Sequence, residues 1–350
     1  MRILIDLGHP AHVHLFRNAI QEWRERGHEV SLAARDKDIV TALLDQLGHE
    51  YCVASRARKG TAGLFLELLE HDWHVFALAR KKRSQLLLGT SVSITHAAKL
   101  LRARSIVFSE DDPDVARAFA RLAYPLADRI VTPRCVRGNY GPKHVVYDSY
   151  HELAYLHPNR FTPDPHVREE LNLGEDEPFF IVRFVSFGAA HDVGEAGIEP
   201  ATQRELLQLL AKYGRVFVSA EGPLPRSCES LRFPIGPERM HHALYFASLL
   251  VGESGTMAAE AAVLGTPAIR CTSLAGRCSI LQELENEYGL TYAFSPDDGK
   301  RMQEKLLSIL EDEANPMVWK RRRERLLEDK HDLTSWMVEF VEREGGRCRG

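Results

Sequence analysis

The sequence predicts an α/β protein built from two Rossmann-like domains, each with a parallel sheet. Short apolar segments alternate with amphipathic helical segments along the whole chain. The apolar segments are hydrophobic at odd and even positions alike, as strands covered by helices on both faces of a parallel sheet require. The length of 350 residues fits two domains of roughly 150–175 residues each.

The first half of the chain opens with a strand over residues 2–7, a Gly-His-Pro-Ala-His loop over 8–12 and a helix over 13–26. A Pro- and Asn-containing segment at 156–165 is predicted as a linker, which gives an N-terminal domain of residues 1–160 and a C-terminal domain of residues 161–330. Further strands are predicted at 29–34, 51–54, 86–88, 106–108, 129–132 and 143–147, and further helices at 39–47, 64–79, 94–101 and 115–124.

The second half repeats the alternation. It ends in a run of predicted helices, the last of which falls within residues 331–350. Strands are predicted at 179–185, 216–220, 249–251 and 267–269, and helices at 203–213, 240–246, 256–264, 280–287, 302–310, 318–327 and 333–344.

The most informative stretch is LLVGESGTMAAEAAVLGTPAI, residues 249–269, which reads as strand, tight turn, helix and strand. The turn leaves the backbone N–H groups of Ser254, Gly255 and Thr256 at a helix N-terminus, where the helix dipole favours a phosphate. Glu260 follows Thr256 by one helical turn, so its carboxylate can reach the ribose of a nucleotide bound there. The pattern fits equally a structural role, in which Ser254 or Thr256 caps the helix and Glu260 is solvated.

The loop after the first strand carries imidazoles in place of glycines. GHPAHV lacks the GxGxxG fingerprint, which argues against NAD or FAD binding. His9, His12 and His14 follow the carboxyl end of the first strand, where open α/β sheets place their ligand crevices, and an imidazole can act as a general base near neutral pH. The alternative is that these histidines only hydrogen-bond to the backbone.

Four carboxylates follow the strand at 106–108: Glu110, Asp111, Asp112 and Asp114. A close pair such as Glu110 and Asp111 can supply an acid and a base, or hold sugar hydroxyls. The structural alternative is that Asp112 or Asp114 caps the helix predicted at 115–124.

Composition excludes several classes of protein. A formal net charge of −4 argues against a broad nucleic-acid-binding surface. The six cysteines and sixteen histidines show neither CxxC pairing nor HExxH spacing, so we expect free thiols and no metal site. No apolar run approaches the ~20 residues of a membrane helix, and no signal peptide opens the chain, so we expect a cytoplasmic protein. The basic run at 80–83 is either a solvated face or a contact for anionic lipid or a phosphorylated acceptor.

The chain resembles an uncharacterised family of predicted glycosyltransferases with a GT-B-like fold, known as domain of unknown function 354. The resemblance rests on DLGHPAHVHLFRN, YPLADRIVTP, YHELAYLHPNRF, RFVSFGAAHDVG and the 249–269 stretch. The last of these is also similar to the nucleotide-sugar motif of two GT-B groups, the muramyl-pentapeptide GlcNAc transferase and the non-hydrolysing UDP-GlcNAc 2-epimerases. The resemblance implies two domains facing across a cleft, with the terminal helix of residues 331–350 packing back on the first domain.

The resemblance also implies roles for individual residues. The Ser254-Gly255-Thr256 turn would hold the UDP diphosphate and Glu260 the ribose. His12 is favoured as the base because Ala11-His12-Val13 is similar to the Gly-Gly-His-Val end of the transferase loop, with alanine in place of the second glycine.

In GT-B proteins the loop after the first strand of the second domain approaches the donor phosphates. This implies that Gly188 allows close backbone contact and that Arg183 or His191 stabilises the phosphate charge. The segment before the helix at 240–246 contacts the base in such proteins, which points to Ile235 and Met240.

Three functions fit these observations. The leading hypothesis is a metal-independent glycosyltransferase that uses a nucleotide-diphosphate sugar, with a UDP-sugar as the expected donor. The acceptor is unknown, and a lipid- or phosphate-linked acceptor is one of the options. The nucleotide sugar is then a substrate, and no cofactor is expected. The alternatives are a UDP-sugar 2-epimerase using Glu110, Asp111 and His191, and a non-catalytic nucleotide-sugar-binding protein. The epimerases carry a Gly-Thr-Arg-Pro-Glu type first loop and an Asp-Ser-Gly-Gly turn, whereas this chain has GHPAH and Glu-Ser-Gly-Thr.

Overall fold

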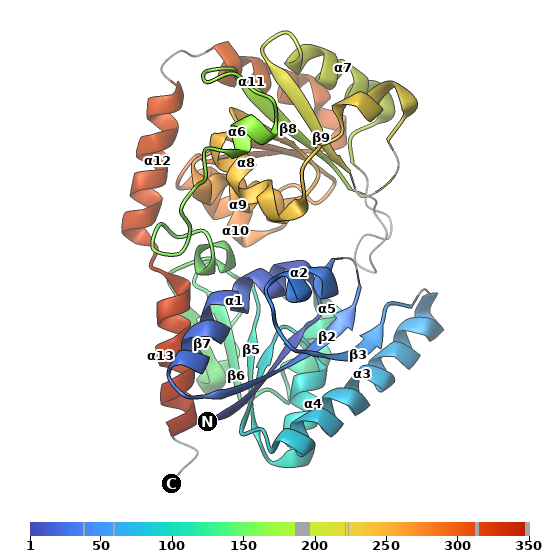
Figure 1. Cartoon of the computed structure of the whole chain (residues 1–350), viewed down its shortest axis with the longest axis vertical. Coiled ribbons are helices and arrows are strands. Elements are labelled where there is room, and N and C mark those ends of the chain that lie inside the picture. The colour runs from blue at the N-terminus through green and yellow to red at the C-terminus, as the bar shows by residue number, and fades with distance from the viewer. Residues whose placement is uncertain are drawn as a thin grey trace. The chain divides into compact units, whose positions relative to one another are not determined.

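A computed structural model (Figure 1) describes residues 1–37, 39–58, 60–185, 197–220, 222, 224–311 and 315–346. The chain divides into two compact units, which are treated separately below. Unit 1 comprises Met1–Tyr155 and Lys330–Gly350, and unit 2 comprises Leu156–Asp329.

Unit 1 contains a seven-stranded sheet in the order β3-β2-β1-β4-β5-β6-β7, and every neighbouring pair in it is parallel. Its central strands β1, β4, β5 and β6 are buried on both faces, as the apolar pattern predicted; the last five residues of β1, for example, are all buried. The strands are β1 (Arg2–Leu7), β2 (Glu29–Asp36), β3 (Cys52–Arg56), β4 (Leu86–Gly89), β5 (Arg104–Phe108), β6 (Arg129–Pro133) and β7 (His144–Tyr147).

Helices cover both faces of this sheet (Figure 1). The helices α1, α2 and α13 pack together on one side, and α3, α4 and α5 pack together on the other. The helical elements of unit 1 are α1 (Pro10–Glu25), α2 (Val40–Gln46), α3 (Gly60–Lys82), α4 (Ser93–Leu101), α5 (Arg117–Ala123), η1 (Gly141–Lys143), η2 (His151–Ala154) and α13 (Leu333–Gly346).

The terminal helix α13 belongs to unit 1 by its own contacts. Thr334 Oγ1 donates to the carbonyl of Ala154 at 2.7 Å, and Glu344 lies 3.0 Å from Arg129 Nε. The helix packs beside α1, and Met337 and Val341 are among its fully buried residues. These contacts tie the end of the chain to the sheet formed by its beginning.

Unit 2 contains a five-stranded parallel sheet in the order β12-β11-β10-β8-β9. The strand–turn–helix–strand prediction for residues 249–269 is confirmed, and Gly265 ends the helix with a φ of 89°. The strands are β8 (Phe179–Phe184), β9 (Arg215–Ala220), β10 (Leu249–Gly252), β11 (Ala268–Cys271) and β12 (Thr291–Phe294). The helical elements are α6 (Val167–Glu170), α7 (Pro200–Leu210), η3 (Arg226–Leu231), η4 (Pro237–Arg239), α8 (Met240–Phe246), α9 (Gly255–Leu264), α10 (Ser279–Asn286), η5 (Pro296–Asp298), α11 (Gly299–Glu311) and α12 (Asn315–Asp329).

One strand of unit 2 was not predicted. Strand β12 was missed because only its first residue is buried, so a short edge strand leaves little apolar signal. In the arginine run at 321–323, only Arg321 is exposed. Arg322 donates to Gly289 O at 2.7 Å, and Arg323 donates to Val263 O at 3.0 Å.

No helix in the described part of the chain is both long enough and apolar enough to cross a membrane.

Candidate functional site

Each sheet has one point at which the strand order reverses direction. In unit 1 it lies between β1 and β4, and in unit 2 between β8 and β10. Open α/β sheets bind ligands outside the carboxyl ends of the strands at such points, because the loops on either side diverge there. The candidate site residues are therefore judged by their positions relative to these two strand ends.

Glycines at both reversal points allow close approach of the backbone. Gly89 ends β4 with a φ of +154°, and a Cβ added there would lie 2.7 Å from Asp6 O of β1. Gly252 ends β10, and its Cβ would lie 2.4 Å from Arg183 O of β8. The two units thus share a construction in which a glycine is paired with a polar residue of the first strand.

The N-terminus of α9 lies directly after the reversal point of unit 2. Ser254 is the N-cap, and its Oγ accepts from Met257 N at 3.3 Å, so the capping role considered for Ser254 is the one seen. Gly255 and Thr256 are the first two helical residues, and their N–H groups have no acceptor within the helix. The phosphate-binding role predicted for this turn rests on those two amides.

Arg270, at the third position of β11, lies against this helix N-terminus. Its side chain is buried, and its Nη1 atom would be only 3.0 Å from a Cβ added to Gly255. Nη2 donates to Leu274 O at 3.2 Å, whereas Nε has no hydrogen-bond partner among the described residues. Burial lowers the pKa of Arg270. A buried cation next to the positive end of a helix is electrostatically unfavourable, and an anion between the two would remove that conflict.

Glu260 is buried inside unit 2 and is not a solvated helix residue. Its Oε1 accepts a hydrogen bond at 2.9 Å from Nε2 of His241, which is also buried and belongs to α8. The alternative of a solvated Glu260 is therefore wrong, since the side chain turns toward the adjacent helix. Met240, predicted to contact the base, is the first residue of α8 and half-buried, and Ile235 lies half-buried in the segment before it.

A second buried carboxylate lies beside the end of β8. Glu253 accepts from Val185 N and from Ile198 N, each at 2.7 Å. The predicted residues Gly188 and His191 lie outside the described residues. Arg183 lies in β8, where its Nη1 donates to Ser219 Oγ at 2.9 Å.

In unit 1, His12 belongs to the first turn of α1. The loop predicted at 8–12 is shorter than expected, because Pro10 occupies the first turn and the His9 side chain caps it by accepting from Ala11 N at 3.2 Å. His14 stacks on Tyr155 with ring centroids 5.2 Å apart. The three histidines therefore have different environments.

His12 reaches across the reversal point to β4. Its Nε2 lies 2.7 Å from Oγ1 of Thr90, the residue after β4, and its buried Nδ1 has no hydrogen-bond partner among the described residues. Burial, with smaller contributions from the neighbouring His9 and His151, holds the pKa of His12 well below its usual value. His12 is consequently a neutral imidazole at pH 7, the form that accepts a proton.

Of the carboxylates after β5, Glu110 lies beside a buried imidazole. Glu110 Oε2 lies 3.1 Å from Nδ1 of His151, a buried residue of η2, whereas the Asp111 side chain is exposed. The capping alternative for Asp112 and Asp114 is wrong. Asp112 Oδ1 accepts from Arg137 N at 3.0 Å, Asp114 lies 3.3 Å from Arg137 Nη2, and α5 begins later without a side-chain cap.

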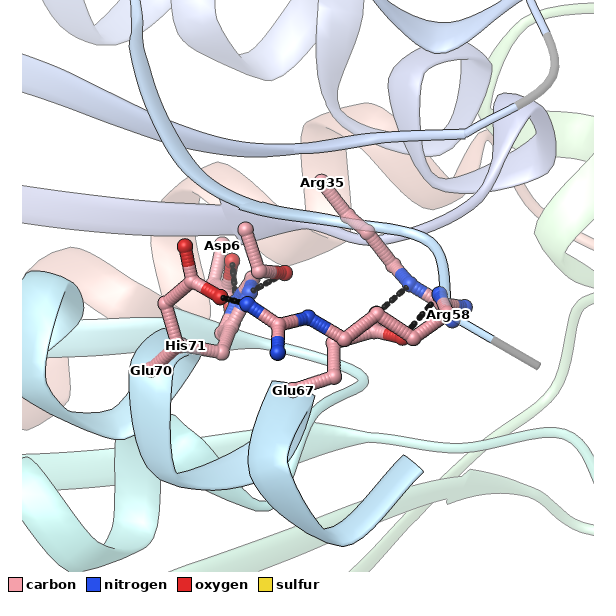
Figure 2. Close-up of polar contacts among 7 residues, drawn as sticks. Asp6, Arg35, Arg58, Glu67, Glu70 and His71 are labelled. Atoms are coloured by element: carbon pink, nitrogen blue, oxygen red, sulfur yellow. Dashed lines mark hydrogen bonds and ion pairs between the residues drawn. The ribbon is translucent and has the colours of Figure 1, made fainter. Parts of the chain in front are cut away.

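A buried network under the loop after β4 was not predicted. Asp6 of β1 is fully buried and lies 2.9 Å from His71 Nε2, while His71 Nδ1 lies 2.7 Å from Ser55 Oγ. Ser91 donates to Asp6 Oδ2 at 2.5 Å, so the network also holds the residue next to Thr90. Figure 2 shows Asp6 and His71 facing each other. The sequence signal of this network was an aspartate in the buried part of β1, ILIDL, whose other residues are all apolar.

Together these residues supply the parts of two different sites. Unit 2 combines helix-terminal amides that have no acceptor within the helix, a buried cation and a buried carboxylate; unit 1 has a neutral imidazole and a carboxylate–imidazole pair. The described residues contain no cluster of His, Cys, Asp and Glu suited to a metal ion.

Comparison with solved structures shows the same two-domain fold. A UDP-GlcNAc 2-epimerase from Neisseria meningitidis, bound to UDP-GlcNAc, superposes with a TM-score of 0.67 at 12% identity, covering 98% of this chain and 100% of that one. The epimerase from Methanocaldococcus jannaschii gives 0.66 at 12% identity, with coverage of 98% and 100%. Glycosyltransferase SsfS6 of Streptomyces sp. SF2575, complexed with thymidine diphosphate, gives 0.63 at 14% identity, with coverage of 98% and 99%.

At such identities the likeness establishes the fold, which is the predicted GT-B-like arrangement of two Rossmann-like domains. No curated protein matches the chain. A family model described as "Protein of unknown function (DUF354)" matches residues 1–185, more than half of the sequence. The chain therefore belongs to this family, as the sequence motifs indicated.

Proposed function

We propose that this protein is a metal-independent glycosyltransferase that uses a nucleoside-diphosphate sugar, with UDP as the expected nucleotide. The observation that carries the proposal is the position of Arg270, a buried guanidinium beside the free amides of Gly255 and Thr256. A diphosphate bound there would accept hydrogen bonds from both amides and from the cation. Arg270 would then neutralise the negative charge of the diphosphate, which a bound metal ion does in metal-dependent glycosyltransferases.

The remaining donor contacts follow from the same site. Glu260, oriented by His241, would accept hydrogen bonds from the ribose hydroxyls, and Ile235 and Met240 would line the base. Gly188, His191 and Arg183 keep their proposed roles near the phosphates. The end of β8, which includes Arg183, meets β10 at the reversal point, where such a ligand would lie.

His12 is the proposed general base. Its neutral imidazole would take the proton of the acceptor hydroxyl while the acceptor oxygen forms a bond to the anomeric carbon. The bond from that carbon to the diphosphate breaks, and the nucleoside diphosphate leaves with the bonding electrons. Thr90, 2.7 Å from His12 Nε2, fixes the orientation of the ring. The acceptor is unknown, and a lipid- or phosphate-linked molecule is one candidate class.

A UDP-sugar 2-epimerase is the second candidate. It is favoured by the Glu110–His151 pair, because a carboxylate and an imidazole 3.1 Å apart can exchange a proton with a sugar carbon or with a leaving group. Asp111 is a weaker candidate for that chemistry, since its side chain is exposed.

One experiment separates the candidates. The full-length protein is incubated with UDP-, GDP-, CMP- and dTDP-sugars without acceptor, and epimers, released nucleotide and thermal shifts are measured. A transferase should be stabilised by one nucleotide and show neither epimer formation nor more than slow hydrolysis. Epimer formation without acceptor would establish the second candidate. Stabilisation that never leads to turnover with any acceptor would indicate a binding protein, and no stabilisation by any nucleotide would overturn the donor site.

A further inference from the structure

The helix α3 has an apolar stripe on the side opposite to its buried stripe. The buried stripe repeats every four residues and consists of Glu67, His71, Val75 and Ala79. The opposite side exposes large apolar side chains, with exposed fractions of 61% for Phe65, 52% for Leu66, 50% for Leu69 and 65% for Trp73. Four such residues on one face of one helix are more than the scattered apolar residues of an ordinary surface.

Ion pairs fix α3 in this orientation (Figure 2). Glu67 pairs with Arg35 of β2, Glu70 pairs with Arg58 at 2.5 Å, and His71 reaches Asp6 of β1 at 2.9 Å. Burial alone would raise the pKa of Glu67, but the hydrogen bonds from Arg35 and Arg58 outweigh it, and the pKa is lowered. The helix therefore cannot roll to bury its apolar stripe without breaking buried polar contacts.

The charge around the stripe is positive. The acidic residues of α3 are each paired, Glu67 and Glu70 as above and Asp72 with His96 at 2.7 Å. In contrast, the residues at and just beyond the carboxyl end of the helix are all exposed cations, namely Arg80, Lys81, Lys82 and Arg83. This local excess of positive charge contrasts with the net charge of the whole chain, which is −4.

We propose that α3 is an interfacial helix that docks this protein onto an anionic lipid bilayer. Phe65, Leu66, Leu69 and Trp73 would enter the boundary between headgroups and acyl chains, while the cations at 80–83 contact lipid phosphates. Aromatic side chains flanked by Lys and Arg suit this boundary because their apolar bodies and polar tips match its two sides.

Charge favours a membrane over a second copy of the chain. In a parallel twofold pairing of α3 helices the cationic ends would face each other. In an antiparallel pairing they would lie beside the first turn of the other helix, which contains no acidic residue to attract them. An anionic surface is attracted in either orientation.

The test is co-sedimentation of the full-length protein with vesicles, combined with tryptophan fluorescence. Phosphatidylcholine vesicles are compared with mixed phosphatidylcholine–phosphatidylglycerol vesicles at low and high salt. Trp73 is a natural reporter, because Trp23 and Trp319 are buried and Trp336 stacks on Phe340. We expect binding to anionic vesicles, a blue shift of the emission, and loss of both at high salt.

Two double variants and a control make the test specific. Phe65→Ser/Trp73→Ser removes the apolar contact, and Lys81→Gln/Lys82→Gln removes charge without touching the ion pairs. Each should lower the vesicle partition coefficient by about tenfold or more. Leu100→Ser, at a residue of α4 that is 73% exposed, should leave it unchanged.

Two results would overturn the proposal. One is that the protein does not bind anionic vesicles at low salt, or that all variants bind them as strongly as the wild type. The other is a concentration-dependent dimer, measured by sedimentation velocity, that both double variants abolish in the absence of lipid; this would assign the stripe to a second copy. Nucleotide binding should be unchanged in all variants, so failure here is separate from failure of the donor site.

Discussion

Replacing Arg270 with methionine should separate ligand binding from stability. The substitution keeps a long apolar side chain in the same buried space but removes the cation beside the α9 N-terminus. Hydrogen bonds to charged groups contribute roughly 1.5–3 kcal/mol. Loss of that interaction with a diphosphate should weaken nucleotide binding about 10- to 150-fold.

The ligand-free protein should respond differently. The variant loses the 3.2 Å bond to Leu274 O, which costs about 0.5–1.5 kcal/mol, but it no longer buries a cation at a positive helix end, which relieves roughly 0.3–1 kcal/mol. The free energy of unfolding should therefore change by less than about 1 kcal/mol. A residue that served only to hold β11 and α9 together would show the opposite pattern, with stability lost and affinity kept.

Denaturant unfolding with and without nucleotide measures both quantities in one experiment. At a ligand concentration of 100 times the wild-type Kd, binding stabilises the wild type by about 2.7 kcal/mol. A 10- to 150-fold weaker variant should gain only about 0.3–1.4 kcal/mol at the same concentration. Arg301→Met, at an exposed arginine of the same unit, is the matched control and should behave as wild type. Equal ligand stabilisation of wild type and Arg270→Met would refute the assignment of Arg270 to the diphosphate.

Three further predictions concern the two reversal points. The pKa of His71 is raised because its buried aspartate partner outweighs burial; this stabilisation is complete below about pH 6.5 and is lost as pH rises through the folded pKa. The unfolding free energies of wild type and His71→Gln should thus converge toward alkaline pH, and a constant difference would contradict this origin. Gly252→Ala places a Cβ 2.4 Å from a backbone carbonyl and should lower the free energy of unfolding by about 1–3 kcal/mol. The control Gly299→Ala, where the added Cβ meets open space, should lower it by less than about 1 kcal/mol. Comparable losses of stability at both positions would be inconsistent with the close approach at Gly252. His12→Ala should lower turnover about 10²–10⁴-fold and leave nucleotide affinity unchanged. Because the pKa of His12 is lowered, the acid limb of the wild-type pH–rate profile should lie below pH 6.5. An acid limb above that pH would exclude His12 as the base.

The fold could be predicted because its determinants are local and repetitive. Each buried strand carries its own apolar run, and Gly265 marks the helix end by a left-handed conformation that favours glycine. The apolar pattern did not predict β12, because this edge strand has little buried surface. The prediction also failed at 8–12, where Pro10 starts the helix and does not interrupt it.

The candidate site was only partly predictable, because its decisive contacts join residues far apart in sequence. Glu260 was chosen from its spacing to Thr256, but its partner His241 comes from another helix. Arg270 looks like an ordinary position in the short strand AIRC until β11 brings it next to Gly255. The role of Asp6 likewise depends on where α3 returns to the sheet. Helical and strand periodicity does not indicate which residues of different elements will be in contact.

The most direct test of the donor site compares the affinities of a nucleoside diphosphate, its monophosphate and its nucleoside. Isothermal titration of the full-length protein would use the uridine, guanosine, cytidine and thymidine series. The account predicts that, in one series, the diphosphate binds at least about tenfold more tightly than the monophosphate, because the second phosphate reaches the amides of Gly255 and Thr256 and the Arg270 cation. Equal affinity for diphosphate, monophosphate and nucleoside, or binding of none, would contradict it.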